Sequence, residues 1–345
     1  MRRLLLAPMA GVNDPVFRAI CRRLGAELTC TEMVSARALA SDHIRSWELL
    51  ETLPRDRPFA IQLFGAEPKI MALQARRLEH RFGDDLAHID INMGCPARKI
   101  LASGSGAALM ANPSLAQQVI EAVVASVNLP VTVKFRKGFA ASDNTALEFA
   151  LMAQASGVAA VAVHGRTAAQ LYRGEADKEL PGRLAQALDI PVIANGDVHT
   201  PANALAYLHS GAAAVMFATG ARGNPWIFKQ TQALLRDPTM HVSEVSFEER
   251  VALSEEHIRG LYLLQPQRLV TMRRHLAWYF KGTSVAAAAR RFVCACTHLD
   301  DYLSLLETLR GMQRELVGET CRDLPRAGDR LYHQPYKSAI KYVNF

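Results

Sequence analysis

Eight short apolar segments recur along this 345-residue chain, and most are followed by a stretch with helical periodicity. The segments are continuous aliphatic or β-branched runs, which are typical of parallel strands buried on both faces. We expect strands at residues 4–7, 27–31, 59–63, 88–92, 131–134, 160–164, 192–194 and 214–217. Helices are expected between them at residues 15–24, 69–81, 113–127, 145–156 and 201–210.

The number of these units favours one α/β architecture. Eight β-then-α units in roughly 220–230 residues suit a (β/α)8 barrel. A doubly wound sheet is the alternative, but it usually has fewer units and a Gly-x-Gly-x-x-Gly turn after its first strand. The turn here reads Pro8-Met9-Ala10-Gly11 instead. We therefore predict a TIM barrel.

The pattern changes after about residue 236. Asp237-Pro238 is interpreted as a linker, and the following segment is helical in periodicity, with Leu269, Met272 and Leu276 on one face. We predict a barrel domain over residues 1–236 and a small all-helical C-terminal domain over residues 245–317. A basic tail over residues 318–345 is expected to be loosely ordered or packed as an extension.

Charge and cysteine usage limit the possible partners. The net charge of +7 and the pI near 9.2 favour an anionic partner, which RNA or DNA would satisfy. The six cysteines include no Cys-x-x-Cys pair, so we expect no metal site and reduced thiols in a cytoplasmic protein. No apolar stretch approaches the length of a membrane span. We expect a monomer with no membrane association.

Polar residues end nearly every predicted strand. In a parallel barrel, the carboxyl ends of the strands converge on one mouth, so these side chains predict one site. They are Pro8, Met9, Ala10, Gln62, Asn92, Cys95, Lys134, Arg136, His164, Arg166, Asn195, Gly196, Asp197, Thr219 and Gly220.

Some of these residues also suit structural roles. Gln62 can satisfy backbone groups, and a lone histidine such as His164 is usually a core residue. Lys134 ends an apolar strand and requires an anionic or carbonyl partner. Gly165, Gly196 and Gly220 permit close backbone approach to a phosphate. Together the residues suit a flat, phosphorylated cofactor such as FMN.

Nine segments, in this order and spacing, resemble the tRNA-dihydrouridine synthases. They are LAPMAGVNDPVFR, TEMVSARAL, QLFGAEP, DINMGCPARK, SGSGAALM, VKFRKGF, VHGRTAAQLYRGEAD, PVIANGDV and GNPWIF. The match covers residues 4 to about 317, and TMRRHLAWYFKG is similar to the C-terminal domain of the bacterial B branch. MGCP, HGRT and NGD are each weak alone but highly specific together.

The resemblance implies an enzyme that uses FMN and NADPH to reduce particular uridines in tRNA. The barrel would bind FMN and the helical domain would bind tRNA. Lys134 would face the side of the flavin where negative charge grows on reduction. The other implied FMN residues are Pro8, Met9, Ala10, Gln62, His164, Asn195, Gly196, Asp197, Thr219 and Gly220.

Cys95 is implied as the proton donor. Reduction of the uracil 5,6 double bond requires a hydride at C6 and a proton at C5, and an ordinary thiol carries its proton at neutral pH. The loop Ser103-Gly104-Ser105-Gly106 is expected to close over a uridine extruded from its helix. A buried structural thiol is the alternative. The expected tRNA contacts are Asn92, Arg98, Lys99, Arg136, Arg166, Arg173, Arg273, Arg274 and Lys281.

Two positions depart from the family pattern. Ala218-Thr219 stands where the family usually has Gly-Arg, at the expected phosphate site, and Lys178 stands where an aromatic residue is common. Two other functions stay open: an FMN barrel that reduces a free pyrimidine or another small alkene, and a flavin-bearing tRNA-binding protein with little catalysis. Arg273, Arg274 and Lys281 form either a phosphate-contacting surface or only a solvated face.

Overall fold

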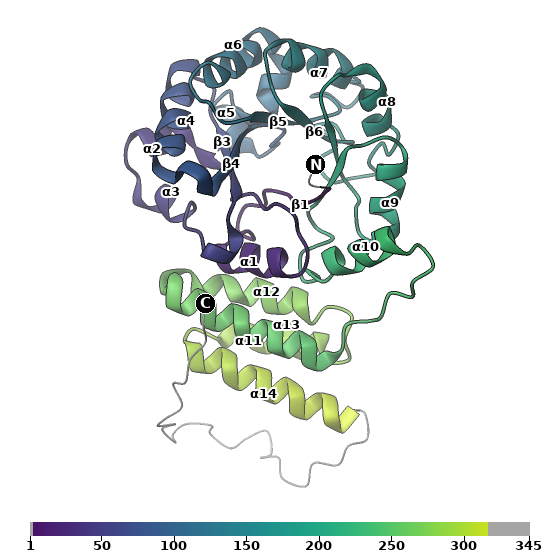
Figure 1. Cartoon of the computed structure of the whole chain (residues 1–345). Helices are drawn as coiled ribbons and strands as arrows, with labels where there is room; N and C mark the ends of the chain where they lie inside the picture. Colours follow the sequence, from purple (N-terminus) through teal and green to yellow (C-terminus); the bar gives the residue numbers. More distant parts are fainter. Residues whose placement is uncertain (1–2, 317–345) are drawn as a thin grey trace. The chain divides into compact units, whose positions relative to one another are not determined.

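Eight parallel strands form the centre of the first part of the chain in the computed structural model, which describes residues 3–316 (Figure 1). Their order in the sheet is β1-β8-β7-β6-β5-β4-β3-β2. The strands are β1 (Leu4–Leu6), β2 (Val34–Ser35), β3 (Phe59–Phe64), β4 (Leu86–Met93), β5 (Val131–Arg136), β6 (Ala160–His164), β7 (Val192–Asn195) and β8 (Ala214–Phe217).

The predicted strand at residues 27–31 is wrong as a regular strand, although this segment does close the barrel. Leu28 bridges Leu5 of β1, and Cys30 bridges Ala60 of β3. The Cys30 carbonyl accepts a hydrogen bond from the Asn13 side chain (2.9 Å), which takes the place of a partner from a strand. The segment is therefore joined to β1 and to β3 by one isolated bridge each, and the regular strand β2 begins only at Val34.

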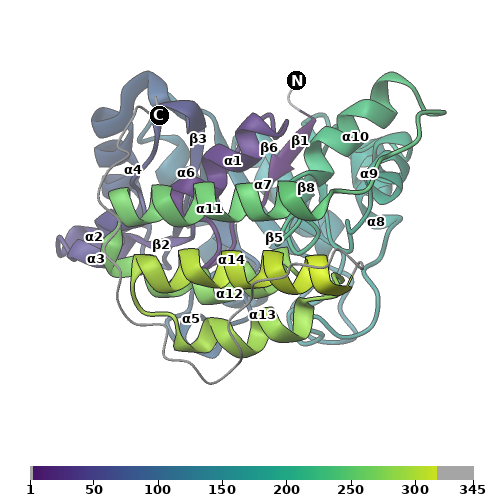
Figure 2. The same ribbon diagram turned by 90° about the horizontal axis from the view of Figure 1, so that it is seen from below.

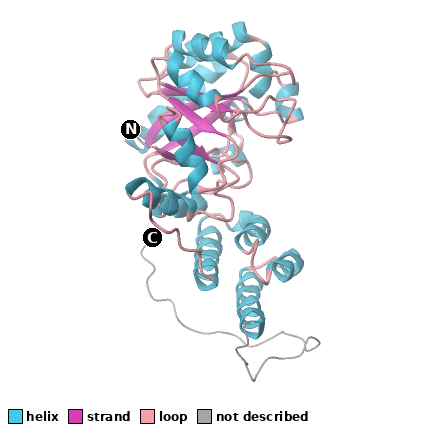
Figure 3. Ribbon diagram, turned by 90° about the vertical axis from the view of Figure 1, so that its right-hand side faces the viewer, coloured by secondary structure: helices cyan, strands magenta, loops and turns pink. Residues whose placement is uncertain are grey.

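Ten α-helices surround the strands within the described part of the barrel (Figure 3). They are α1 (Pro15–Arg23), α2 (Ala36–Ala40), α3 (Ile44–Glu48), α4 (Pro68–Phe82), α5 (Arg98–Ala102), α6 (Pro113–Val124), α7 (Ala146–Ala155), α8 (Leu180–Ala187), α9 (Pro201–His209) and α10 (Ile227–Arg236). The five predicted helices are confirmed as α1, α4, α6, α7 and α9. Short 3-10 helices span Pro54–Asp56, Gly83–Asp85 and Gly106–Ala111.

The two faces of the strands pack differently because successive side chains point to opposite sides. Val133, Phe135 and Val163 lie in the large apolar cluster that includes helix residues. Ala160 and Ala162 belong to a separate small cluster, whose members come mainly from the strands. The side chains of Lys134 and His164 lie on the same face of the sheet as these alanines. On this face, therefore, polar side chains lie between the small apolar cluster and the carboxyl ends of the strands. The predicted TIM barrel is confirmed.

A second compact unit begins at Ser246, after a first unit that ends at Val245. Its helices are α11 (Phe247–Leu264), α12 (Met272–Tyr279), α13 (Ala286–Phe292) and α14 (Leu299–Leu316), with 3-10 helices at Pro266–Thr271 and Val293–Ala295 (Figure 2). The predicted helical C-terminal region is confirmed. The predicted tail at residues 318–345 lies outside the described residues.

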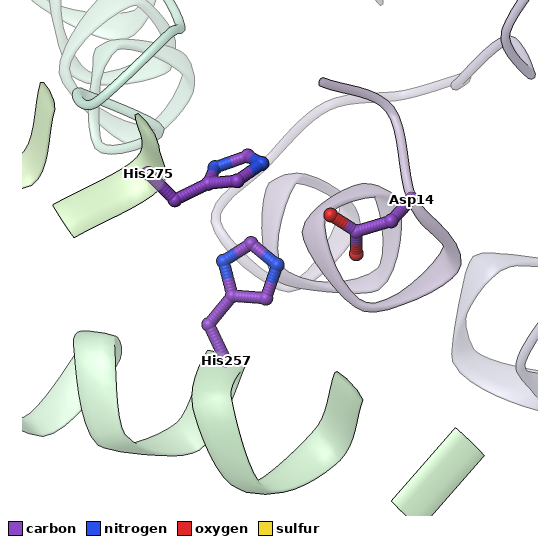
Figure 4. Close-up of side chains that lie close together, drawn as sticks. All are labelled: Asp14, His257 and His275. Carbon is purple, nitrogen blue, oxygen red and sulfur yellow. The ribbon is translucent and has the colours of Figure 1, made fainter. Parts of the chain in front are cut away.

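The core of this helical unit contains the predicted apolar stripe. Leu269, Met272 and Leu276 are all buried. Beside them the rings of His257 on α11 and His275 on α12 lie with their centroids 4.5 Å apart (Figure 4). Among the described residues, none of the helices combines the length and the apolar character that crossing a bilayer requires.

Candidate active site

A cavity of about 700 Å³ lies at the carboxyl ends of the strands. Cavities of this size hold cofactors and drug-sized ligands. The structure brings most of the predicted site residues to its lining. They are Pro8, Met9, Ala10, Gln62, Asn92, Cys95, Lys134, Arg136, His164, Arg166, Asn195, Gly196, Asp197 and Thr219.

Cys95 lies in a turn that is held from several directions. The Asn92 side-chain oxygen accepts hydrogen bonds from the backbone N–H groups of Gly94 (3.2 Å) and Cys95 (2.9 Å). The Gly94 carbonyl accepts from Arg136 Nε (2.8 Å), and the Cys95 carbonyl accepts from Ala107 N (3.0 Å). The thiol side chain is half-buried at the cavity wall. These contacts fix the backbone that carries the thiol.

The loop predicted to close over the site is packed against this turn. Ser105 and Gly106 are buried. Gly106 has φ +61°, and a Cβ at this position would lie 2.8 Å from the Cys95 carbonyl oxygen. The loop therefore supports Cys95 in this structure.

Lys134 places an ammonium group at the cavity. Within residues 3–316 its Nζ makes no hydrogen bond or ion pair. Burial, followed by the charge of Arg136, lowers the pKa of Lys134 to about 8. A half-buried cation in this position favours an anionic or carbonyl-bearing ligand.

His164 presents a neutral imidazole. Its Nδ1 accepts a hydrogen bond from the Arg166 backbone N–H (3.3 Å), so the proton of the neutral ring is on Nε2. Burial lowers the pKa of His164 well below its usual value, and the nearby Lys134 and Arg136 charges lower it further. The Nε2–H group is thus available as a donor to a ligand.

Arg136 and Arg166, predicted as tRNA contacts, already have partners inside the barrel. Arg136 is buried and also donates to the carbonyls of Thr167 (2.9 Å) and Leu171 (2.8 Å). Arg166 pairs with both carboxylate oxygens of Asp197, each at 2.8 Å. Although burial opposes it, the Arg166 guanidinium lowers the pKa of Asp197. We infer that these arginines hold loops in place.

The glycines at the strand ends divide by role. Gly196 lines the cavity with φ +116°. Gly220 does not line it, and a Cβ there would meet the Val198 carbonyl oxygen at 2.0 Å. Gly165 similarly approaches Asp177. Gly220 and Gly165 therefore allow close loop-to-loop packing, and the phosphate contact expected for each of the three glycines stays a prediction.

Other predicted contacts lie away from the cavity lining. Arg98 and Lys99 begin the short helix α5, and Arg173 lies in the loop after β6. In the helical unit, Arg274 and Lys281 are exposed, but Arg273 is half-buried and donates to the Cys296 carbonyl (2.9 Å).

Several lining residues were not among the predicted site residues. Tyr172 is 71% exposed, and the Arg136 guanidinium lies 5.6 Å from its ring centroid. Tyr172, His199 and Arg222 all come from loops that follow a strand. They lie several residues beyond the strand ends, so only their position in the loops after β6, β7 and β8 indicates that they reach the mouth of the barrel.

Comparison with known proteins gives a consistent result. Residues 5–315 match the family model described as dihydrouridine synthase (Dus). The tRNA-dihydrouridine synthase B of Pseudomonas aeruginosa is 36% identical over 308 residues, which cover 87% of this chain and 89% of that protein. The protein of the same name from Shewanella oneidensis is 38% identical, covering 80% of this chain and 86% of that protein. A probable tRNA-dihydrouridine synthase 1 from Synechocystis is 36% identical, with 88% and 85% coverage.

Proposed function

The chain belongs to the dihydrouridine synthase family, and on that premise we propose that it reduces the 5,6 double bond of uridines in tRNA, with FMN as cofactor, NADPH as reductant and Cys95 as proton donor. The observation that carries the proposal is the opening of Cys95, Lys134 and His164 onto one cavity at the mouth of the barrel. The names of the relatives support tRNA as the substrate.

The residues around the cavity fit FMN. Lys134 offers an ammonium group that no described residue binds, and His164 offers an N–H donor. Thr219, Arg222 and His199 line the same cavity, and they provide a hydroxyl and cationic or ring donors for a phosphate. When bound, FMN supplies the hydride that it has received from NADPH. Lys134 and His164 would hold the polar edge of the ring.

Cys95 holds the proton that the reduction consumes. Its turn keeps the thiol at the cavity wall through the bonds from Gly94, Cys95 and Ala107 described above. A general acid must lie within hydrogen-bond reach of the atom it protonates, so a fixed turn is what this role requires. Because the side chain is half-buried, solvent can return the proton after each turnover.

A substrate comparison tests this proposal. The purified holoprotein is given NADPH and either unmodified tRNA or free uridine, and dihydrouridine is measured by mass spectrometry. We expect dihydrouridine in the tRNA and little product from free uridine. Equal turnover of free uridine would instead indicate a reductase of small pyrimidines. Bound FMN and tRNA without any product would indicate a binding protein.

A further inference from the structure

One hydrogen-bonded chain runs from the barrel interior to the Cys95 turn. Its first members, Gln62, Asp90 and Thr132, are paired across β3, β4 and β5 in the sheet register. Thr132 donates to Asp90 Oδ1 (2.6 Å), and Gln62 Nε2 donates to Asp90 Oδ2 (2.6 Å). Asn92 Nδ2 then donates to Gln62 Oε1 (2.7 Å). Asn92 Oδ1 is the atom that binds the turn.

The chemistry of Asp90 sets the direction of this chain. An ionised carboxylate only accepts hydrogen bonds, so Gln62 must turn its nitrogen towards Asp90 and its oxygen towards Asn92. Asn92 must then offer its nitrogen to Gln62, which leaves its oxygen for the turn. The backbone N–H groups of Gly94 and Cys95 only donate, and they require that same oxygen. The Asp90 carboxylate at one end of the hydrogen-bonded chain and the backbone N–H groups at the other therefore require the same orientation of both amides.

We propose that Asp90 is a positioning residue that fixes both amides through this chain and so holds Cys95 in place for proton transfer. Asp90 is 2% exposed and does not line the cavity, so it acts only through its neighbours. Burial raises the pKa of Asp90 to about 6, although the bonds from Thr132 and Gln62 and the charge of Lys134 oppose the rise, so the carboxyl is mostly ionised at neutral pH. The proposal rests on the proposed function for the role of Cys95.

Asp90→Asn is the direct test because it keeps the shape and removes the acceptor-only character. The amide introduced by this substitution can offer its nitrogen to Gln62, which frees Gln62 and Asn92 to rotate. We expect kcat for dihydrouridine formation to fall about 10–100-fold with little change in the KM for tRNA. We also expect alkylation of Cys95 by iodoacetamide to be about fivefold faster relative to the exposed Cys294 of the same holoprotein, because the loosened turn opens more often.

Asp56→Asn is the matched control. Asp56 is a fully buried carboxylate that accepts hydrogen bonds from Arg18, Thr29 and Thr52, and none of these partners within residues 3–316 belongs to the Cys95 turn. The Asp56→Asn substitution should lower the melting temperature but leave the alkylation ratio and kcat within about twofold of the wild-type values. If Asp90→Asn does not fold, Asn92→Ala cuts the chain next to the turn and should accelerate Cys95 alkylation similarly.

The two readouts separate this inference from the proposed function. Faster Cys95 alkylation in Asp90→Asn, with a wild type that makes no dihydrouridine, supports the chain and refutes the function. An active wild type with an unchanged kcat and alkylation ratio in Asp90→Asn overturns the positioning role. An unchanged alkylation ratio in Asn92→Ala overturns it equally.

Discussion

A methyl group at Gly106 is expected to displace the Cys95 turn, and Gly104 in the same loop provides the control. Both glycines have positive φ, +61° for Gly106 and +72° for Gly104. A Cβ at Gly106 would lie 2.8 Å from the Cys95 carbonyl oxygen and 2.7 Å from Ile100 Cγ2. A Cβ at Gly104 would meet only Ala66 Cβ, at an ordinary 3.6 Å.

The two alanine variants therefore share the backbone strain and differ in the contact. Alanine in the left-handed region costs about 1–2 kcal/mol in either position. In Gly106→Ala the free energy of unfolding should fall by roughly a further 1–3 kcal/mol. The Cys95 carbonyl that the new methyl group meets accepts a hydrogen bond from Ala107 N and cannot move freely. A shift of Cys95 by a fraction of an ångström should also slow proton transfer about tenfold or more.

Urea unfolding and single-turnover dihydrouridine formation measure the two effects. Gly106→Ala should unfold at lower urea than Gly104→Ala and should form dihydrouridine more slowly at saturating tRNA. Equal stability and equal rates for the two variants would refute the claim that this loop supports the catalytic turn.

The cofactor site and the helical unit give three more expectations. The pKa of Lys134 is lowered to about 8, so its ammonium group is charged below that pH and neutral above it. The FMN affinity of the apoprotein should therefore be constant below that pH and fall about tenfold per pH unit above it. Lys134→Met should abolish this pH dependence in fluorescence titrations. Thr219→Arg should tighten FMN by about 1–2 kcal/mol in the same titration; unchanged affinity would assign the phosphate to Arg222. Replacing the exposed Arg274 and Lys281 by alanine should reduce the slope of log tRNA affinity against log salt by about 1.5, and an unchanged slope would mean that they are only solvated.

The strands were predictable because burial on both faces leaves a continuous apolar run. The segment at residues 27–31 (ELTCT) is only partly apolar. It pairs through two isolated bridges, and its Cys30 carbonyl binds the Asn13 side chain, a tertiary contact that no local pattern shows. The short helices α2, α3 and α5 have five residues each, which is too few for a periodic pattern.

The location of the site was predictable, but the partners of its side chains were not. Parallel topology alone brings Lys134 and His164 to one mouth. Whether a guanidinium faces solvent or a carbonyl depends on loops distant in sequence. Arg136 therefore binds the carbonyls of Gly94 and Thr167, and Arg166 binds Asp197, a set of contacts that no local pattern encodes.

The most direct test of the central claim separates the two half-reactions in Cys95→Ala, with the exposed Cys294→Ala as control. FMN content and the rate of flavin reduction by NADPH should match wild type in both variants, since neither step needs the thiol. Dihydrouridine formation in tRNA should then slow by about 10²–10⁴ in Cys95→Ala and stay normal in Cys294→Ala. A wild-type rate of tRNA reduction in Cys95→Ala would contradict the account.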